Sequence, residues 1–135
     1  MNMKRLLLAI VAAYVAMSIL GIATEVLLAD FTIQMKAISR MGADLEAHAM
    51  WMYLGYFIVT ILFCYIYAHH HEGKGWQEGA RYGLLIGLMM SGISMVMYAT
   101  MPFDGTEVFI SALAGVVIYT VGGIVTALVY KNESS

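Results

Sequence analysis

Four long stretches of the chain are almost entirely apolar, and short polar segments separate them. Each stretch is close to the roughly 20 residues that an α-helix needs to cross about 30 Å of hydrocarbon. Because the bilayer core offers no water to backbone N–H and C=O groups, such segments are expected to be helices. The pattern predicts an all-α fold, in which residues 1–135 form one four-transmembrane-helix bundle of two helical hairpins. The predicted spans cover residues 6–28, 49–68, 82–101 and 109–129.

Composition supports a membrane protein. Hydrophobic residues make up 61% of the chain and charged residues only 12%, against roughly 25% charged residues in soluble domains. The net charge of −2 offers no basic field for nucleic acid. The first apolar stretch is longer than the roughly 7–15 apolar residues of a signal peptide, so we expect it to be retained as a helix.

Lysine and arginine gather on one side of the predicted bundle. Two of them lie in the first loop, Lys36 and Arg40. The other basic residues flank the opposite side: Lys4, Arg5, Lys74, Arg81 and Lys131. By the positive-inside rule, this asymmetry predicts a multi-pass protein of the cell inner membrane with cytoplasmic N- and C-termini.

The loop between the first two spans has a helical pattern of its own. Apolar residues recur there every three or four positions, which is one face of a helix. Asp30 can cap the start of such a helix, and Gly42 can end it. The apolar face consists of Phe31, Met35, Ile38, Met41 and Leu45. We expect a short amphipathic surface helix in this first outer loop.

Small residues recur at four-residue spacing in the third and fourth spans. Between membrane helices, close backbone approach at small residues does much of the work that apolar burial does in water. The helix-packing candidates are Gly79, Gly83, Gly87, Ser91, Ser111, Gly115 and Gly123. They predict that these two spans make the tightest contact, either within one chain or between subunits.

Two titratable residues stand at similar depth near the outer ends of the first two spans, Glu25 and His48. An ionisable group at membrane depth is a functional hypothesis, because its desolvation is costly. One interpretation is a polar site in which the two side chains meet across the hairpin. The other is a pair of interfacial residues that reach headgroups or water.

The remaining histidines offer little for a metal or a haem. His69, His70 and His71 are consecutive, so they point about 100° apart on a helix and do not chelate as residues one turn apart would. Their charge suits a helix C-terminus instead. All four histidines lie on or beside the second span, so no facing pair is available for a haem.

The sulfur-containing residues are the other candidates for chemistry. The twelve methionines are either apolar filler or thioether ligands for Cu(I). Cys64 stands alone, which excludes an internal disulfide or a CxxC redox pair. No catalytic motif is present. We therefore expect no catalytic residue, no metal site and no cofactor.

One segment has a distinctive composition. Residues 72–75 read EGKG, and residues 78–84 read EGARYGL at the predicted start of the third span. This segment resembles small four-helix bacterial inner-membrane proteins of no assigned function, which pair a glycine-rich inner turn with an E-G-x-R-[YF]-G-L helix start. The resemblance implies a bacterial inner-membrane protein and brings no catalytic or binding residue with it.

Two functions are compatible with these features. The first is a non-enzymatic membrane protein that acts by association in the lipid bilayer, as an accessory subunit of a larger membrane complex or as a small homo-oligomer. The alternative is a small proton- or cation-linked transporter that uses Glu25.

Overall fold

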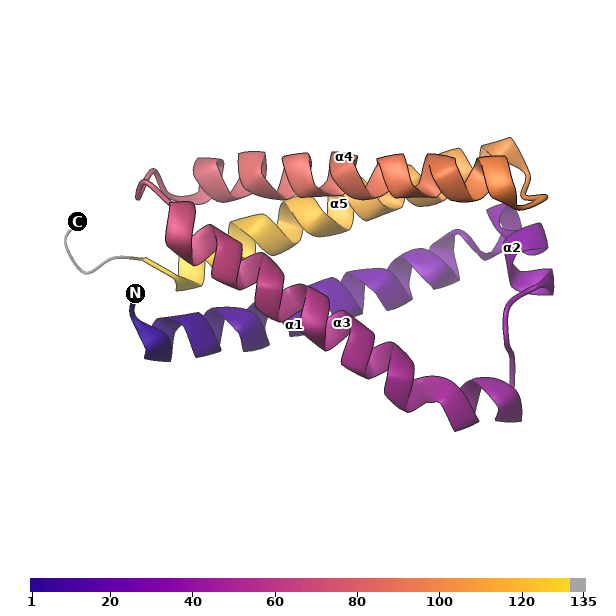
Figure 1. The fold of residues 1–135 in the computed structure, drawn as a ribbon, viewed down its shortest axis with the longest axis horizontal. Coiled ribbons are helices and arrows are strands. Elements are labelled where there is room, and N and C mark those ends of the chain that lie inside the picture. The colour runs from indigo at the N-terminus through magenta and orange to yellow at the C-terminus, as the bar shows by residue number, and fades with distance from the viewer. Residues whose placement is uncertain (132–135) are drawn as a thin grey trace.

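The structure, a computed structural model, describes residues 1–131. It consists of helices and their connections, and four of the helices are long (Figure 1). These are α1 (Met3–Leu27), α3 (Ala43–His70), α4 (Trp76–Thr100) and α5 (Gly105–Val129). Each is long and apolar enough to cross a membrane. The prediction of four helices that are long and apolar enough to span a membrane is therefore confirmed.

Each long helix begins before its apolar stretch. At α1, the Asn2 side chain accepts a hydrogen bond from the backbone N–H of Arg5 at 3.2 Å. At α5, the Asp104 carboxylate accepts from the backbone N–H groups of Thr106 and Glu107. These capping bonds satisfy N–H groups that have no partner within the helix. Polar residues therefore extend the helices past the boundaries that hydropathy predicts.

The connection between α1 and α3 holds two short helices, a 3-10 turn over Ala29–Phe31 and α2 over Ile33–Ala37. Asp30 lies inside the 3-10 turn, and Thr32 is the N-cap residue of α2. Gly42 precedes α3 with a positive φ of 58°. The helical part of this loop is therefore shorter than its apolar pattern predicts, and Asp30 does not cap it.

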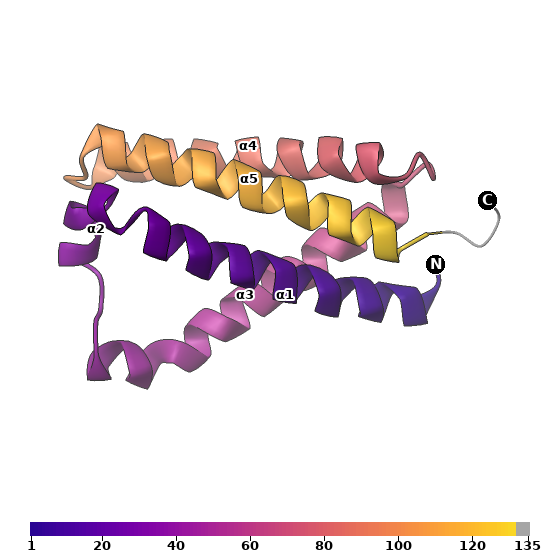
Figure 2. The same cartoon turned by 180° about the vertical axis from the view of Figure 1, so that it is seen from behind.

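The molecule has two ends, which we call the α2 end and the terminus end. The α2 end holds α2 and the turn at residues 101–104, and the terminus end holds the N-terminus, the turn at residues 71–75 and the end of α5 (Figures 1 and 2). Gly73 and Gly75 have φ values of 78° and 77°, which glycine adopts without steric cost. The glycine-rich turn predicted between the second and third spans is present.

Helices α4 and α5 lie side by side along their length. There is no room for a side chain at Gly79 or Gly83, because a Cβ atom would overlap the backbone carbonyl of Gly123 or Tyr119. At Gly87 a Cβ atom would come within 2.8 Å of the Cα atom of Val116. This is the close backbone approach that glycine permits between membrane helices.

Helix α5 also packs against α1. At Gly122 a Cβ atom would lie 2.6 Å from the sulfur atom of Met17 on α1. The next residue, Gly123, faces α4 instead. Two adjacent glycines thus let α5 approach a neighbour on each side, and α5 becomes the central helix of the fold.

Helix α3 crosses the other helices and separates from them toward the α2 end (Figures 1 and 2). Its buried residues, Thr60, Phe63, Cys64, Tyr67 and Ala68, all lie in its second half. All of them except Thr60 belong to a hydrophobic core at the terminus end, whose other buried members are Leu6, Ala9, Ile10, Ala13, Ala127 and Tyr130. In residues 43–59, every residue except Ala49 is exposed.

Aromatic contacts hold α3 against α4 at the terminus end. The Tyr82 hydroxyl donates a hydrogen bond to the backbone carbonyl of Phe63 at 2.6 Å. The two rings lie 4.7 Å apart, and the Tyr82 ring lies 5.5 Å from that of Tyr67. A polar link within an aromatic cluster fixes the position of α3 here, whereas its other half lacks such contacts.

Candidate functional site

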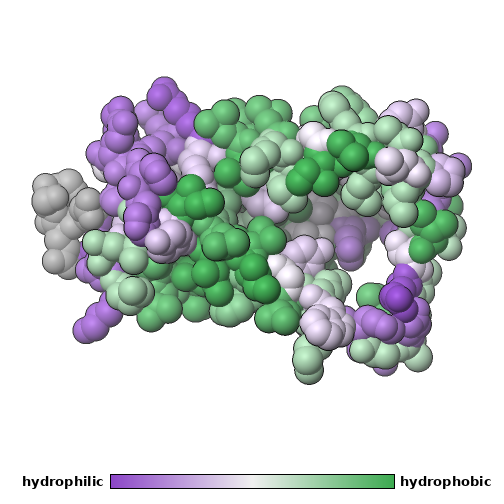
Figure 3. All heavy atoms as spheres, in the orientation of Figure 1, coloured by the Kyte–Doolittle hydropathy of each residue, from purple (hydrophilic) through white to green (hydrophobic). Residues whose placement is uncertain are grey.

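A cavity of about 270 Å³ opens between α1, α3 and α5 in the half of the molecule toward the α2 end. Figure 3 shows the surface hollowed in this half. Two glycines contribute to its width, Gly21 of α1 and Gly115 of α5, since a Cβ atom on either would meet no other atom within 4 Å. The cavity thus lies where α3 leaves the bundle.

Oxygen-bearing side chains line the cavity at several levels. The acid is Glu25, near the end of α1. The hydroxyl-bearing residues are Tyr14, Ser18, Tyr53, Tyr56, Thr60 and Tyr119. Apolar side chains complete the wall: Met17, Ile22, Met52, Val59 and Ile118. A wall of this kind, mostly apolar with a few polar groups, is typical of a small-molecule site.

The side chains of the cavity tyrosines are available to contact a ligand. Thr60 uses its hydroxyl within α3, where it donates to the backbone carbonyl of Tyr56 at 2.8 Å. By contrast, among residues 1–131 the hydroxyls of the four cavity tyrosines make no hydrogen bond with the protein. Tyr53 and Tyr56 are more than half exposed. Their hydroxyls and ring faces can therefore contact whatever fills the cavity.

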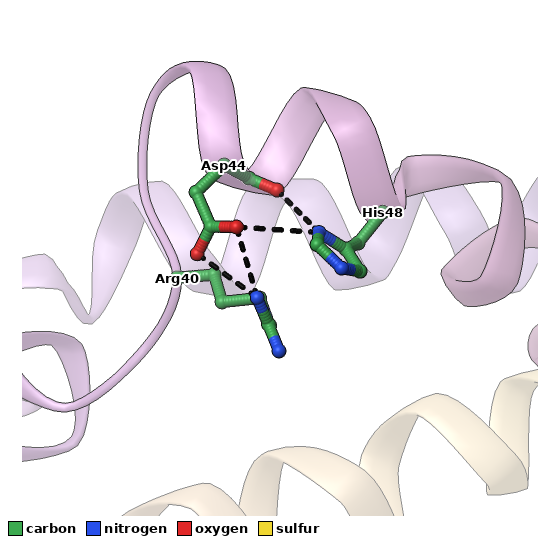
Figure 4. Close-up of polar contacts among 3 residues, drawn as sticks. All are labelled: Arg40, Asp44 and His48. Carbon is green, nitrogen blue, oxygen red and sulfur yellow. Dashed lines mark hydrogen bonds and ion pairs between the residues drawn. The ribbon is translucent and has the colours of Figure 1, made fainter.

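Glu25 and His48 belong to different surroundings. Glu25 is exposed and lines the cavity. His48 instead contacts Asp44 in the first turn of α3, where its Nδ1 lies 2.8 Å from the backbone carbonyl oxygen and 3.3 Å from the carboxylate (Figure 4). No hydrogen bond or ion pair joins Glu25 to His48 in the part of the chain that the structure describes. The two candidate residues therefore do not form one polar site: Glu25 lines the cavity, and His48 contacts Asp44.

Asp44 is the centre of a small ion cluster at the start of α3. Nη1 of Arg40 donates to both carboxylate oxygens of Asp44, at 2.9 and 3.1 Å (Figure 4). The three side chains of this cluster are those of Arg40, Asp44 and His48, and each is about half exposed. Exposed ion pairs contribute little to stability, so the cluster orders the start of α3 without anchoring it to the bundle.

The glycines among the helix-packing candidates lie in two different places, the contact between α4 and α5 and the cavity wall. Gly79, Gly83, Gly87 and Gly123 lie in the α4–α5 contact, as the fold shows. Gly115 lies on the cavity instead. At 3.6 residues per turn, eight residues leave Gly115 about 80° around the helix from Gly123. A strict four-residue repeat therefore drifts off the contacting face of α5.

The two serines of that set make local contacts. The Ser91 hydroxyl donates to the Gly87 carbonyl of its own helix at 3.0 Å. The Ser111 hydroxyl lies 3.5 Å from the sulfur atom of Met35 in α2. Ser111 therefore faces the first loop.

One buried acid was not among the sequence candidates. Glu107, in the first turn of α5, is only 9% exposed. Its two carboxylate oxygens accept hydrogen bonds from the backbone N–H groups of Gln34 and Met35, each at 2.9 Å. Glu107 thus caps α2 from a distant part of the chain. Because Gln34 and Met35 are far from Glu107 in the sequence, this role could not be predicted from a local pattern. The only sequence signal is an acid in the first turn after the capping residue Asp104.

The terminus end holds the residues considered for metal and redox chemistry. Cys64 is fully buried, with its sulfur 3.5 Å from the hydroxyl of Thr126. His71 packs against the rings of Tyr67 and Tyr130. Within residues 1–131, no three side chains of histidine, cysteine, aspartate or glutamate lie close enough to hold a metal ion. Cys64 and His71 both pack against neighbouring side chains at this end.

The turn at residues 71–75 is organised by charges. The Glu78 carboxylate of α4 accepts hydrogen bonds from the backbone N–H groups of Glu72 and Lys74. Glu72 and Lys74 also form an ion pair. The hydrogen bond from the Lys74 ammonium lowers the pKa of the Glu72 carboxyl, and the same bond raises the pKa of Lys74. The conspicuous acids of the glycine-rich segment therefore shape a turn.

No protein-family model, curated protein or solved structure matches this chain. The resemblance carried by residues 78–84 therefore stays a prediction. The features that bear on function are therefore the cavity and the exposed part of α3.

Proposed function

We propose that this protein is a non-enzymatic integral membrane protein that acts by association, as a small oligomer or as an accessory subunit of a larger membrane complex. The observation that carries the proposal is the exposure of α3 over residues 43–59, where only Ala49 is partly covered. The exposed residues include both the face toward the cavity and the outward face. In a finished assembly, another helix would cover part of this surface.

This segment also forms a shallow apolar groove with α1 beside the cavity, and Tyr14 and Tyr53 line both. The lining of the groove consists of Val11, Tyr14, Ala49, Met50, Tyr53, Leu54 and Phe57. Ala49 provides the small residue that lets a second helix approach, and the edge-to-face contact of Tyr14 and Phe57, with ring centroids 5.7 Å apart, fixes the floor. A partner helix that packs against the small residue Ala49 is the occupant that we propose for this groove.

We further propose a bacterial inner membrane with both termini in the cytoplasm. The basic residues that predict this orientation support it: Lys4 and Arg5 lie at the terminus end, whereas Lys36 and Arg40 lie at the α2 end. In this orientation, the apolar side chains of the first loop face the outer membrane surface. Phe31, Ile33 and Ile38 are all more than half exposed, which supports a surface location for this loop.

Disulfide cross-linking in native membranes tests the association. A cysteine is placed at Leu54 in the groove, in a Cys64→Ala background. The control is a cysteine at Leu88 of α4, because Leu54 and Leu88 are 45% and 54% exposed. The proposal expects a cross-linked dimer, or an adduct of fixed size with another subunit, from Leu54→Cys alone. Equal yields from the two positions would show only random collision and would defeat the proposal.

The cavity favours a second candidate function, a small proton- or cation-linked transporter. The specific observation concerns the cavity wall, which extends from the α2 end to Tyr14 and Thr60, near the middle of α1 and α3. In the part of the chain that the structure describes, Glu25 is the single charged residue on this wall. In a flux assay with reconstituted vesicles, Glu25→Gln should abolish transport while the protein still inserts. Transport that survives in Glu25→Gln removes this candidate.

A further inference from the structure

We propose that the cavity between α1, α3 and α5 binds a small hydrophobic cation, a substituted ammonium group, with Glu25 as its counter-ion and tyrosine ring faces around it. This inference names a ligand class for the second candidate function, and it rests on that candidate only for transport. Binding itself depends on the cavity alone.

The charge of the lining sets the sign of the ligand. Among residues 1–131, Glu25 is the one charged residue on the wall, and no lysine, arginine or histidine lines it. An anion would therefore face a carboxylate with no basic group to offset it. A cation would be attracted, and the low-polarity surroundings strengthen that attraction relative to water.

The rings of the lining set the chemical class. Tyr14, Tyr53, Tyr56 and Tyr119 come from three different helices and line one cavity. The face of a tyrosine ring attracts a cation within about 6 Å of its centroid, and several rings together form the cage that binds quaternary ammonium groups. Met17, Met52 and Ile118 add apolar surface. A cation with alkyl or aromatic substituents fits this wall better than a bare metal ion, which needs several ligands of its own.

The dimensions and the exposure of the cavity limit the ligand further. At about 270 Å³ the cavity lies just under the range of roughly 300–1,000 Å³ that holds drug-sized molecules. Tyr53 and Tyr56 are 57% and 59% exposed, so one side of the cavity is open. A small ammonium group can therefore enter either as a free amine or as the headgroup of a lipid such as phosphatidylethanolamine.

The test is a titration of the purified full-length protein with benzyltrimethylammonium in an uncharged maltoside detergent, followed by calorimetry. The proposal expects saturable binding that the neutral isostere neopentylbenzene does not reproduce. Glu25→Gln should weaken binding about tenfold, as loss of a close charge pair does. The matched control is Glu46→Gln, an exposed acid of the first turn of α3 outside the cavity, which should bind like the wild type.

Two further variants separate the rings from the charge. Tyr56→Phe keeps the ring and should bind nearly as well as the wild type, whereas Tyr56→Leu removes it and should lose about threefold in affinity. Gly115→Leu adds bulk at a position with open space around it, so the protein should fold while the ligand is displaced.

The competing lipid identifies the source of the ammonium group. Displacement of the probe by phosphatidylethanolamine points to a lipid headgroup, and lack of displacement points to a free amine. Absence of saturable binding, or equal loss in Glu25→Gln and Glu46→Gln, would overturn the inference. Binding without flux in vesicles would leave it standing and remove the transporter.

Discussion

The two halves of this molecule are built differently, although the same helices run through both. At the terminus end, α1, α3 and α5 share a core of buried residues that includes Ala9, Cys64 and Ala127. Toward the α2 end, α3 leaves the bundle and a cavity opens beside it. In this fold, therefore, the buried core lies in one half of these helices and the open cavity lies in the other half.

The residues through which α1 and α3 meet differ between the two halves. At the terminus end, alanine and cysteine side chains of α1 and α3 are buried in the shared core, and such small residues allow helices to approach closely. In the other half, Tyr53 and Tyr56 of α3 line the cavity and are more than half exposed. Helix α5 runs through both halves and contacts α4 through Gly123 and α1 through Gly122.

The largest effect is expected at the α4–α5 contact, on which both halves depend. In Gly83→Val the new side chain would overlap the carbonyl of Tyr119 and the Cα atom of Thr120, so the helices must separate. We expect a loss of about 3 kcal/mol in the free energy of unfolding, measured by denaturation with SDS in mixed micelles. Gly92→Val on the same helix meets nothing within 4 Å and should unfold like the wild type.

The next effect belongs to the α2 end alone. Glu107→Gln removes the charge that accepts from the N–H groups of Gln34 and Met35, and the loss should be about 1.5 kcal/mol for a charged hydrogen bond. Hydrogen exchange should then become faster at residues 33–37 and unchanged at the terminus end. Faster exchange throughout the protein would mean that the halves are not independent.

A smaller effect tests the terminus end. Tyr82→Phe removes the hydrogen bond to the Phe63 carbonyl and should cost about 0.6 kcal/mol, the average for such bonds between membrane helices. Tyr98→Phe is the matched control, because Tyr98 is half exposed on the same helix and makes no hydrogen bond with residues 1–131. Equal changes in the two variants would contradict a special role for Tyr82.

The smallest effect is expected from the ion cluster at the start of α3. Asp44→Asn removes the charge that pairs with Arg40. Since both side chains are more than half exposed, the loss should be about 0.3 kcal/mol and should vanish at high salt. A loss as large as that of Glu107→Gln would show that α3 is anchored at this end after all.

The long helices can be predicted from the sequence because each corresponds to one continuous apolar stretch of sufficient length. The sequence also identifies Gly79 and Gly83, because a four-residue repeat is local to one helix. The role of Glu107 escapes it, since the N–H groups that this carboxylate binds lie more than 70 residues away in the chain. The surroundings of Glu25 also depend on the path of α3, which no local pattern encodes.

Thiol labelling tests the contrast between the halves most directly. Ser18→Cys places a second thiol on the cavity wall, while the native Cys64 reports on the core at the terminus end. The reagent is 2-aminoethyl methanethiosulfonate, a small water-soluble cation, applied before and after denaturation. The account predicts that the folded wild type is unlabelled, that folded Ser18→Cys gains one label, and that denaturation exposes Cys64 in both. Labelling of Cys64 in the folded protein, or protection of the cysteine at position 18, would contradict it.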